Sequence, residues 1–320
     1  MAIFSRDHLE TLLVAIDVGT FDAAAVVLGV TPSAVSQRVK AMEQIAGRVL
    51  LQRSSPVRPT GDGEVVLRHA RQMRLLDTET SRALGLRTGA RDGTDAGASG
   101  DPVPTPSIPL AVNADSLGTW FLDALHRARR DTDVVFEVHR EDQERTATLL
   151  RSGVVMAAVT STRRPVQGCS VVLLGVMRYI PVAAPAFLER YFGGIAVDDR
   201  LAALDRVPLV DFDRDDDLQQ AFLRDVLGRE SRPPRHAIPT SHDFARAILL
   251  GFGWGLLPEE QCREHLAAGR LVELAPRRTS DVELWWQRWD LASPLLDRLT
   301  DAVRSVATDR LRQPRQHSSR

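Results

Sequence analysis

Polar side chains at helical spacing mark residues 31–46. If this stretch is helical, one face carries Ser33, Ser36, Gln37, Lys40 and Gln44. Hydroxyls, amides and a cation of this kind hydrogen-bond base edges and phosphates of DNA. An ordinary amphipathic surface helix would show the same pattern, so the flanking sequence has to decide between the two interpretations.

The same stretch has the features that start a helix and bury one side of it. Thr31 can cap the N-terminus, and Pro32 suits the first helical position because an N–H there would have no helical partner. The face opposite the polar one is apolar, with Val35, Val39 and Met42 at spacings of four and three. We therefore predict a helix that packs one face on a core and leaves the other free.

Two shorter helical patterns and a pair of strands flank this helix. The patterns end at Gly19 and Gly29, and helices joined by a glycine turn ahead of a third helix are typical of a helix-turn-helix. Residues 49–53 and 56–58 predict two short strands that form a wing, which makes residues 1–60 a winged helix-turn-helix domain. We predict base contacts by Ser33, Ser36, Gln37 and Arg38. We predict phosphate contacts by Lys40, Arg53 and Arg58, with Thr31, Pro32 and Ser54 beside them.

Positive charge is concentrated in this domain. The chain of 320 residues has a net charge of -1, which argues against a general nucleic-acid coat, yet residues 31–60 carry five basic side chains and a single acid. Cys169 and Cys262 are too few and too far apart for a disulfide framework or a zinc site. No stretch has the pattern of a signal peptide or a membrane span. We expect a soluble, cytoplasmic protein with no membrane partner and no cofactor.

An uninterrupted helical pattern continues over residues 61–87. Its apolar side repeats every seven residues in two adjoining rows, one of Val66, Met73 and Thr80 and one of His69, Leu76 and Ala83. The alternative is a long helix that packs along its own domain. We expect no further surface of the chain that such a helix could cover. We expect a dimerising linker helix over residues 61–88, with an interface formed by Val66, Met73, Leu76 and Ala83. A homodimer would present two recognition helices to two half-sites.

The composition changes twice after this helix. Residues 89–107 are rich in Gly, Ala, Asp and Pro without apolar periodicity, which predicts a flexible tether and leaves the orientation of the following domain open. From residue 108, short apolar runs alternate with amphipathic segments, as is typical of βαβ units. We predict an α/β effector domain with lobe I over 108–163 and 276–320 and lobe II over 164–275. A ligand would lie between the lobes, at the C-terminal ends of strands.

The stretch FDAAAVVLGVTPSAVSQRVKAMEQIAGRVLLQRSSPVRPTGDGEVVLRHA resembles the N-terminal domain of LysR-type transcriptional regulators, including the T-P-S-A-V-S-Q helix start and the P-T-x-x-G after the wing. Two later stretches, VNADSLGTWFLDAL and LWWQRW, are similar to the ArgP/LysG-like branch, whose members respond to lysine and arginine. This resemblance covers nearly the whole chain and implies a two-lobed, periplasmic-binding-protein-like effector domain. It also implies a homotetramer that bends operator DNA, activates a divergent target and, in this branch, controls a basic-amino-acid exporter. RNA polymerase is then a further candidate partner.

A basic amino acid needs hydrogen-bond donors for its carboxylate and acids for its cationic groups. Donors at predicted strand ends or helix starts are offered by Asn113, Ser116, Thr160, Ser161, Thr240, Ser241 and His242. We predict that the acids are Asp115, Asp211 and Asp213, with Glu137 and Asp142 as further candidates. The acids at 215–217 are also typical of a solvated helix N-terminus. A different small carboxylate in the same cleft is the alternative effector.

Three classes of function combine a DNA-binding domain with an α/β domain. For an enzyme the sequence offers no support, because it has no nucleophile elbow, H-E-x-x-H, P-loop or tight cluster of Cys and His. An architectural DNA-binding protein would leave about two hundred residues of α/β domain without a role. We therefore predict a sequence-specific transcriptional regulator that senses lysine or arginine and controls a transport gene such as an amino-acid exporter.

Overall fold

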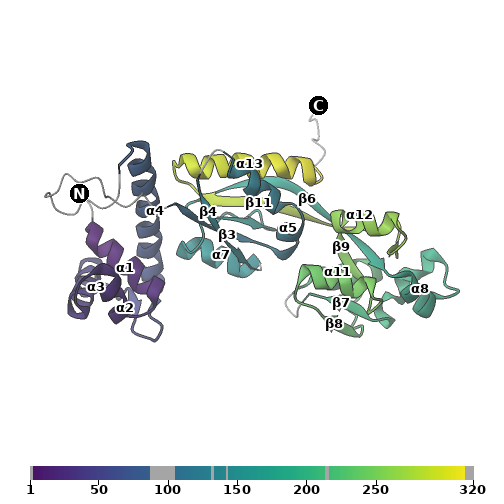
Figure 1. Cartoon of the computed structure of the whole chain (residues 1–320). Helices are drawn as coiled ribbons and strands as arrows, with labels where there is room; N and C mark the ends of the chain where they lie inside the picture. Colours follow the sequence, from purple (N-terminus) through teal and green to yellow (C-terminus); the bar gives the residue numbers. More distant parts are fainter. Residues whose placement is uncertain (1–2, 87–104, 131–132, 142, 213–215, 314–320) are drawn as a thin grey trace, which may run out of the picture.

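The computed structural model describes residues 3–86, 105–130, 133–141, 143–212 and 216–313 (Figure 1). Asp142 and Asp213, two of the predicted effector contacts, lie outside these residues, and so does the predicted tether up to residue 104. Ser107, the last residue of that tether, instead begins a strand.

Three helices and a two-stranded wing form the N-terminal domain. The helices are α1 (Arg6–Val18), α2 (Phe21–Leu28) and α3 (Pro32–Ala46), and the wing pairs β1 (Leu51–Gln52) with β2 (Arg58–Pro59) in antiparallel register. Each helix follows a Ser or Thr N-cap whose hydroxyl accepts a backbone N–H, and each ends at a glycine with left-handed backbone. The predicted helix-turn-helix is confirmed.

The apolar face predicted for α3 is buried. Val35 and Met42 are completely inaccessible, and Val39 is 2% exposed. Val39 and Met42 pack with Leu12 of α1 and Leu67 of the following helix. Burial of one side chain of this size stabilises a fold by about 1.5–3 kcal/mol. This burial fixes which face of α3 is turned away from the domain.

The long helix α4 (Gly61–Ala83) connects the two domains and ends short of the predicted residue 87. Leu67 and Ala70 pack in the N-terminal core, whereas Leu75 packs in the core of the α/β domain together with Ile108. The helix therefore covers surfaces of its own chain on two sides, so the expectation that no such surface was available to it is wrong. Its outer side stays open, since Met73 is 41% exposed.

Charged side chains of α4 fasten it to the α/β domain. Arg68 donates to the carbonyl oxygens of Gln167 and Gly168, at 2.7 Å each. Glu79 accepts a hydrogen bond of 2.8 Å from the hydroxyl of Ser293, at the start of the last helix. These contacts join α4 directly to the α/β domain, so the orientation that the tether left open is set by the docked helix (Figure 1).

Parallel strands form one half of the large sheet, in the order β4–β3–β5. Helices connect them as predicted for βαβ units. The strands are β3 (Ser107–Val112), β4 (Val135–Arg140) and β5 (Ala157–Thr160). The connecting helices are α5 (Ala114–Thr119), α6 (Phe121–Ala128) and α7 (Gln143–Ser152).

Two long antiparallel strands carry the sheet from one lobe to the other. β11 (Ser280–Trp289) pairs with β5 and with β6 (Cys169–Ala183), and the far end of β6 pairs with β9 (Gly255–Pro258) and β10 (Val272–Glu273). Because β6 and β11 run through both lobes, they are the covalent hinge between them (Figure 1).

The remaining elements complete the second lobe and close the first. A second, two-stranded parallel sheet pairs β7 (Leu209–Asp211) with β8 (Arg235–Ala237). The helices of the second lobe are α8 (Pro185–Phe192), α9 (Arg200–Ala203), α10 (Leu218–Leu227), α11 (Ser241–Leu249) and α12 (Glu259–Ala267). The last helix, α13 (Pro294–Arg310), returns to the first lobe and packs on α6. Within the described residues, none of the helices has the length and apolarity needed to cross a bilayer.

Replacement of Arg68 by alanine tests the docking of α4. The variant loses two hydrogen bonds from a charged donor, and each such bond contributes about 1.5–3 kcal/mol. We expect a lower thermal unfolding midpoint and faster amide exchange at residues 166–169. Arg74→Ala is the matched control on the same helix, because Arg74 makes only a surface ion pair of 3.6 Å with Asp17. Equal midpoints for the two variants would contradict the docking role of Arg68.

Candidate DNA interface and ligand pocket

The outward face of α3 presents polar side chains without competing partners. Ser33, Gln37 and Lys40 are exposed, and Ser36 is half-buried beside them. Thr31 is occupied as the N-cap, since its hydroxyl accepts the N–H of Ala34 at 3.2 Å. Pro32 fills the first helical position. The face can therefore enter a groove, with short donors and acceptors directed outward.

Arg38 does not belong to that face. Its guanidinium donates to the hydroxyl of Thr11 at 3.2 Å and forms an ion pair of 3.4 Å with Asp7, both on α1. Along a helix, Arg38 follows Gln37 by about a hundred degrees, which turns it toward the neighbouring helix. The predicted base contact of Arg38 therefore does not fit, and its role here is to fasten α3 to α1.

The wing is anchored to the helices that flank it. Glu43 of α3 accepts the N–H of Leu50 at 2.9 Å, and the N–H of Val57 donates to the carbonyl of Gly19 at 2.8 Å. The hydroxyl of Ser54 donates to the carbonyl of Pro56 at 2.6 Å, so Ser54 shapes the wing turn. These contacts hold the tip of the wing beside the exposed face of α3.

Three basic side chains of this domain remain without an acidic partner in the described part of the chain. Arg48 pairs with Asp62 at 3.2 Å, whereas Lys40, Arg53 and Arg58 are exposed and form no ion pair. An unpaired cation on a surface gains most from a phosphate, because it loses no existing contact. Lys40, Arg53 and Arg58 are therefore the cations of this domain that are available to a phosphate.

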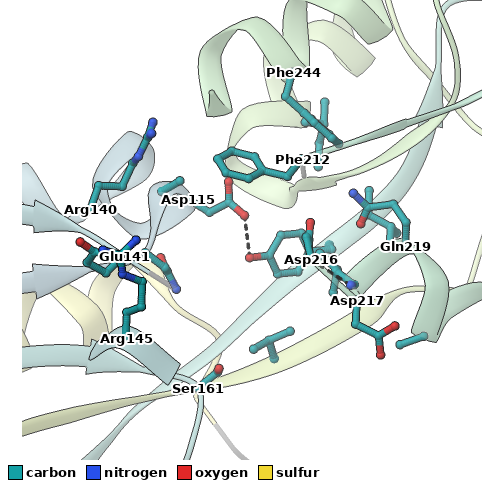
Figure 2. A pocket seen from close by; sticks show the side chains of 18 residues that line it. Asp115, Arg140, Glu141, Arg145, Ser161, Phe212, Asp216, Asp217, Gln219 and Phe244 are labelled. Carbon is teal, nitrogen blue, oxygen red and sulfur yellow. Dashed lines mark hydrogen bonds and ion pairs between the residues drawn. The ribbon is translucent and has the colours of Figure 1, made fainter. Parts of the chain in front are cut away.

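A pocket of about 590 Å³ lies between the two lobes of the α/β domain (Figure 2). Asn113, Asp115 and Ser161, all predicted from the sequence, line it from the first lobe. Tyr179 of β6 forms part of the wall between the lobes, and Phe212 and Phe244 line it from the second lobe, as Figure 2 shows. The ligand site expected between the lobes is thus present as a cavity of the size of a small molecule.

Asp115 is the best-supported acid in the pocket wall. Its two oxygens accept hydrogen bonds from the hydroxyls of Tyr179, at 2.9 Å, and Ser241, at 3.0 Å. Burial raises the pKa of Asp115, and these two hydrogen bonds offset part of that shift. Burial and the neighbouring carboxyl also raise the pKa of Tyr179 well above its usual value, so Tyr179 stays a donor. Each oxygen of Asp115 keeps a second lone pair for a ligand.

Asn113 and Ser116 occupy the start of α5 in different ways. The side-chain oxygen of Asn113 accepts the N–H of Ser116 at 2.7 Å, which leaves its amide N–H₂ to face the pocket. Ser116 is completely buried and does not line the pocket, so its predicted ligand contact does not fit.

Several other predicted contacts lie outside the pocket lining. Thr160 is buried and donates to the carbonyl of Thr162, and Asp211 is held by the guanidinium of Arg235 at 2.7 Å. Thr240 caps α11 and hydrogen-bonds Asp243, and Ser241 acts on the pocket only through Asp115. The exposed His242 and the ion pair of Glu137 with His139 are also away from it. Asp211 pairs with Arg235 of β8, whereas the next residue, Phe212, lines the cavity.

The charged residues that face each other from the two walls of the pocket were not identified from the sequence. The first lobe supplies Arg140, Glu141 and Arg145, in which Arg145 pairs with Glu141 at 3.2 Å. The second lobe supplies Asp216 and Asp217, which a solvated helix N-terminus would also explain from sequence alone. Arg140, the last residue of β4, lies at a strand C-terminus, and this position was the available signal.

The arrangement suits binding rather than bond breaking. The first lobe offers the cation Arg140, the amide of Asn113 and the carboxylate of Asp115, and the second lobe offers the carboxylate of Asp216. No group of three or more His, Cys, Asp or Glu side chains in the described residues could hold a metal ion. A winged helix-turn-helix that is docked through one helix to a domain with such a pocket defines a ligand-responsive DNA-binding regulator.

Comparison with known families places the chain. Residues 6–64 match the model of the bacterial regulatory helix-turn-helix protein, lysR family, and residues 104–308 match the LysR substrate binding domain. The chain belongs to the LysR family of transcriptional regulators, and it is not an enzyme.

Relatives match it over nearly their whole length. The lysine export transcriptional regulatory protein LysG of Corynebacterium efficiens is 42% identical over 95% of this chain and 98% of its own. The crystal structure of ArgP from Mycobacterium tuberculosis is 40% identical and superposes with a TM-score of 0.83 over 96% of this chain and 98% of its own. Full-length LysG from Corynebacterium glutamicum with bound effector Arg is 37% identical, with a TM-score of 0.77 over 97% of this chain and 100% of its own.

The raised pKa of Asp115 predicts a specific pH dependence. Because the folded pKa lies above the unfolded one, this group stabilises the fold at low pH, and the contribution is lost as the pH rises through the folded pKa. Asp115→Asn removes the titration. The unfolding midpoint of the ligand-free variant should therefore rise relative to wild type as the pH increases from about 4, the ordinary pKa of an Asp, through the raised folded pKa of Asp115. Asp301→Asn, at an exposed position on α13, is the control. A difference for Asp115→Asn that stays constant over this range would contradict the assignment.

Proposed function

We propose that this regulator senses a basic amino acid, lysine or arginine, and controls a transport gene such as an amino-acid exporter. The observation that carries the proposal is that both signs of charge line the pocket, with Arg140 on the first lobe and Asp216 on the second, and with a further carboxylate, Asp115, on the first. A ligand that satisfies both walls must have an anionic end and a cationic one. The volume of about 590 Å³ is ample for one amino acid.

The ligand orientation follows from these charges. The α-carboxylate lies against Arg140 and the free amide N–H₂ of Asn113, while the cationic groups face Asp115 and Asp216. An aliphatic stem between the two ends packs on Phe212 and Phe244. Among the hydroxyls predicted from the sequence, Ser161 lines the pocket and can donate to the carboxylate. Another small carboxylate would bind on the Arg140 side but would bring no cation to the acids.

The names of the relatives support the same ligand class. One relative is described as a lysine export regulator, and a second was solved with bound effector Arg. Their identity to this chain, 42% and 37%, extends over the domain that holds the pocket. We extend the ligand class and the export target to this protein on that basis, and with them a cytoplasmic location, where operator DNA and RNA polymerase are available.

For DNA we propose that Ser33, Ser36 and Gln37 contact base edges and that Lys40, Arg53 and Arg58 hold phosphates. The supporting observation is that these cations are exposed and unpaired within the described residues. A homodimer through the outer side of α4, with pairing to a tetramer through the effector domains, would bring two such faces to one operator. Met73 is exposed on that side, Leu76 is half-buried, Val66 is half-buried against the core of the N-terminal domain, and Ala83 ends the helix.

Ligand binding is tested by thermal unfolding and footprinting. A ligand that binds only the folded state at a hundredfold excess over its dissociation constant stabilises it by about 2.7 kcal/mol. Lysine or arginine should therefore raise the unfolding midpoint and alter the footprint on the protein's own upstream region. Norleucine, which lacks the cationic end, is the control. Stabilisation by norleucine equal to that by lysine would rule out recognition by the acids.

The DNA contacts are tested by two substitutions with different signatures. Gln37→Ala should flatten the preference among operator variants by about 1–3 kcal/mol, as expected for loss of a base contact. Arg58→Ala should weaken binding to every sequence and lower the magnitude of the salt slope by about one. Fluorescence anisotropy on operator and scrambled duplexes measures both. Arg48→Ala is the control, because Arg48 is already paired with Asp62. An unchanged preference in Gln37→Ala would show that α3 is not the reading helix.

A further inference from the structure

Gln219 has an unusual position in the ligand pocket. It lies in the first turn of α10, is 1% exposed, and lines the cavity between the lobes. Its side-chain oxygen is buried and has no hydrogen-bond partner in the part of the chain that the structure describes. A buried acceptor without a partner costs about 1–3 kcal/mol, and each such atom in a folded protein needs an explanation.

The surroundings of Gln219 specify what can approach it. Leu218, Phe244 and Leu256 line the same pocket, so the cavity wall of the second lobe is largely apolar. Asp216 also lines it and already accepts the N–H of Leu218 at 3.0 Å with one of its oxygens. A group that enters this part of the pocket meets an apolar surface with acceptors and is favoured only if it donates hydrogen bonds. Figure 2 shows Gln219 and Asp216 on the same side of the cavity.

We propose that Gln219 is the specificity-determining residue for the far end of the ligand, where it accepts a hydrogen bond from a terminal N–H group of the amino-acid side chain. This inference rests on the proposed function and deepens it, because it assigns ligand selection to a neutral amide as well as to the acids. The ligand class is an α-amino acid with an aliphatic stem and a terminal ammonium or guanidinium group.

A neutral acceptor fits this place for an electrostatic reason. Asp216 and Asp217 lie two or three residues before Gln219 and both line the pocket. A third carboxylate beside them would repel the first two and raise the cost of burial, since like charges at short range disfavour ionisation. An amide provides the lone pairs without the charge. A planar guanidinium, with five donors, can serve Asp216 and Gln219 together.

The penalty for a wrong ligand follows from the same burial. A ligand that ends in a methyl group covers the oxygen of Gln219 with hydrocarbon, which removes access to any other donor. Sites with buried polar groups reject analogues that lack the matching polar atom more strongly than apolar pockets reject a missing methylene. Gln219 therefore acts against apolar amino acids as much as it acts for basic ones.

The test measures dissociation constants by calorimetry on the full chain, with arginine, lysine, citrulline and norleucine as ligands. Citrulline has terminal N–H donors without a charge, and norleucine has neither. Gln219→Met, which keeps the length and removes the acceptor, should weaken arginine binding about tenfold or more and strengthen norleucine binding, because the penalty for covering the oxygen is gone. Gln219→Glu, which keeps an acceptor, should retain most of the affinity for arginine.

The outcomes separate this inference from the proposed function. Arginine affinity in Gln219→Met within about twofold of wild type would overturn the role of Gln219 while leaving basic-amino-acid sensing intact. A wild-type protein that binds neither arginine nor lysine would overturn the proposed function and this inference with it. If Gln219→Met failed to fold, the dissociation constants of the four ligands with the wild-type protein would test the role of Gln219 instead. Binding of norleucine as tight as that of citrulline would then rule out a hydrogen bond at the far end.

Discussion

The structure depends on the contact between Arg68 and the loop ahead of β6. The guanidinium reaches the carbonyls of Gln167 and Gly168 at 2.7 Å each. This approach is possible because Gly168 and Gly153, which face Arg68, have no side chain. A Cβ at Gly168 would lie 2.8 Å from that guanidinium, and one at Gly153 would lie 2.9 Å from the backbone of Arg68. Leu75 of α4 is buried in the core of the α/β domain, so α4 connects the DNA-binding domain to the α/β domain in a fixed orientation.

The fixed connection through α4 matters because the ligand pocket is built from two lobes that share only a few strands. β6 and β11 pass between the lobes, and the pairing shifts register between Leu284 and Trp285. A ligand held by Arg140 on one wall and by Asp216 and Gln219 on the other stabilises the arrangement in which both walls reach it. α4 packs in the cores of both the DNA-binding domain and the α/β domain, so it joins the two domains directly.

Much of the DNA-binding domain could be predicted, and less of the pocket. The caps at Thr31 and Gly29 and the apolar spacing of Val35, Val39 and Met42 are local signals, and all of them are confirmed. Pocket residues come from strand ends far apart in the chain. Their type alone did not separate Asp216, which lines the cavity, from Asp211, which is paired with Arg235.

What the sequence determined by itself was therefore the set of elements and the class of protein, because helix caps, periodicity and the recognition-helix motif act over a few residues. Tertiary structure alone decided which polar groups stay free. Arg38 is removed from the DNA face by Asp7 and Thr11 of another helix, and Gln219 is brought to the cavity with an unpaired oxygen. The physical reason is that a partner distant in sequence, rather than the residue's own type, decides whether a charged or polar side chain has hydrogen bonds left for a ligand.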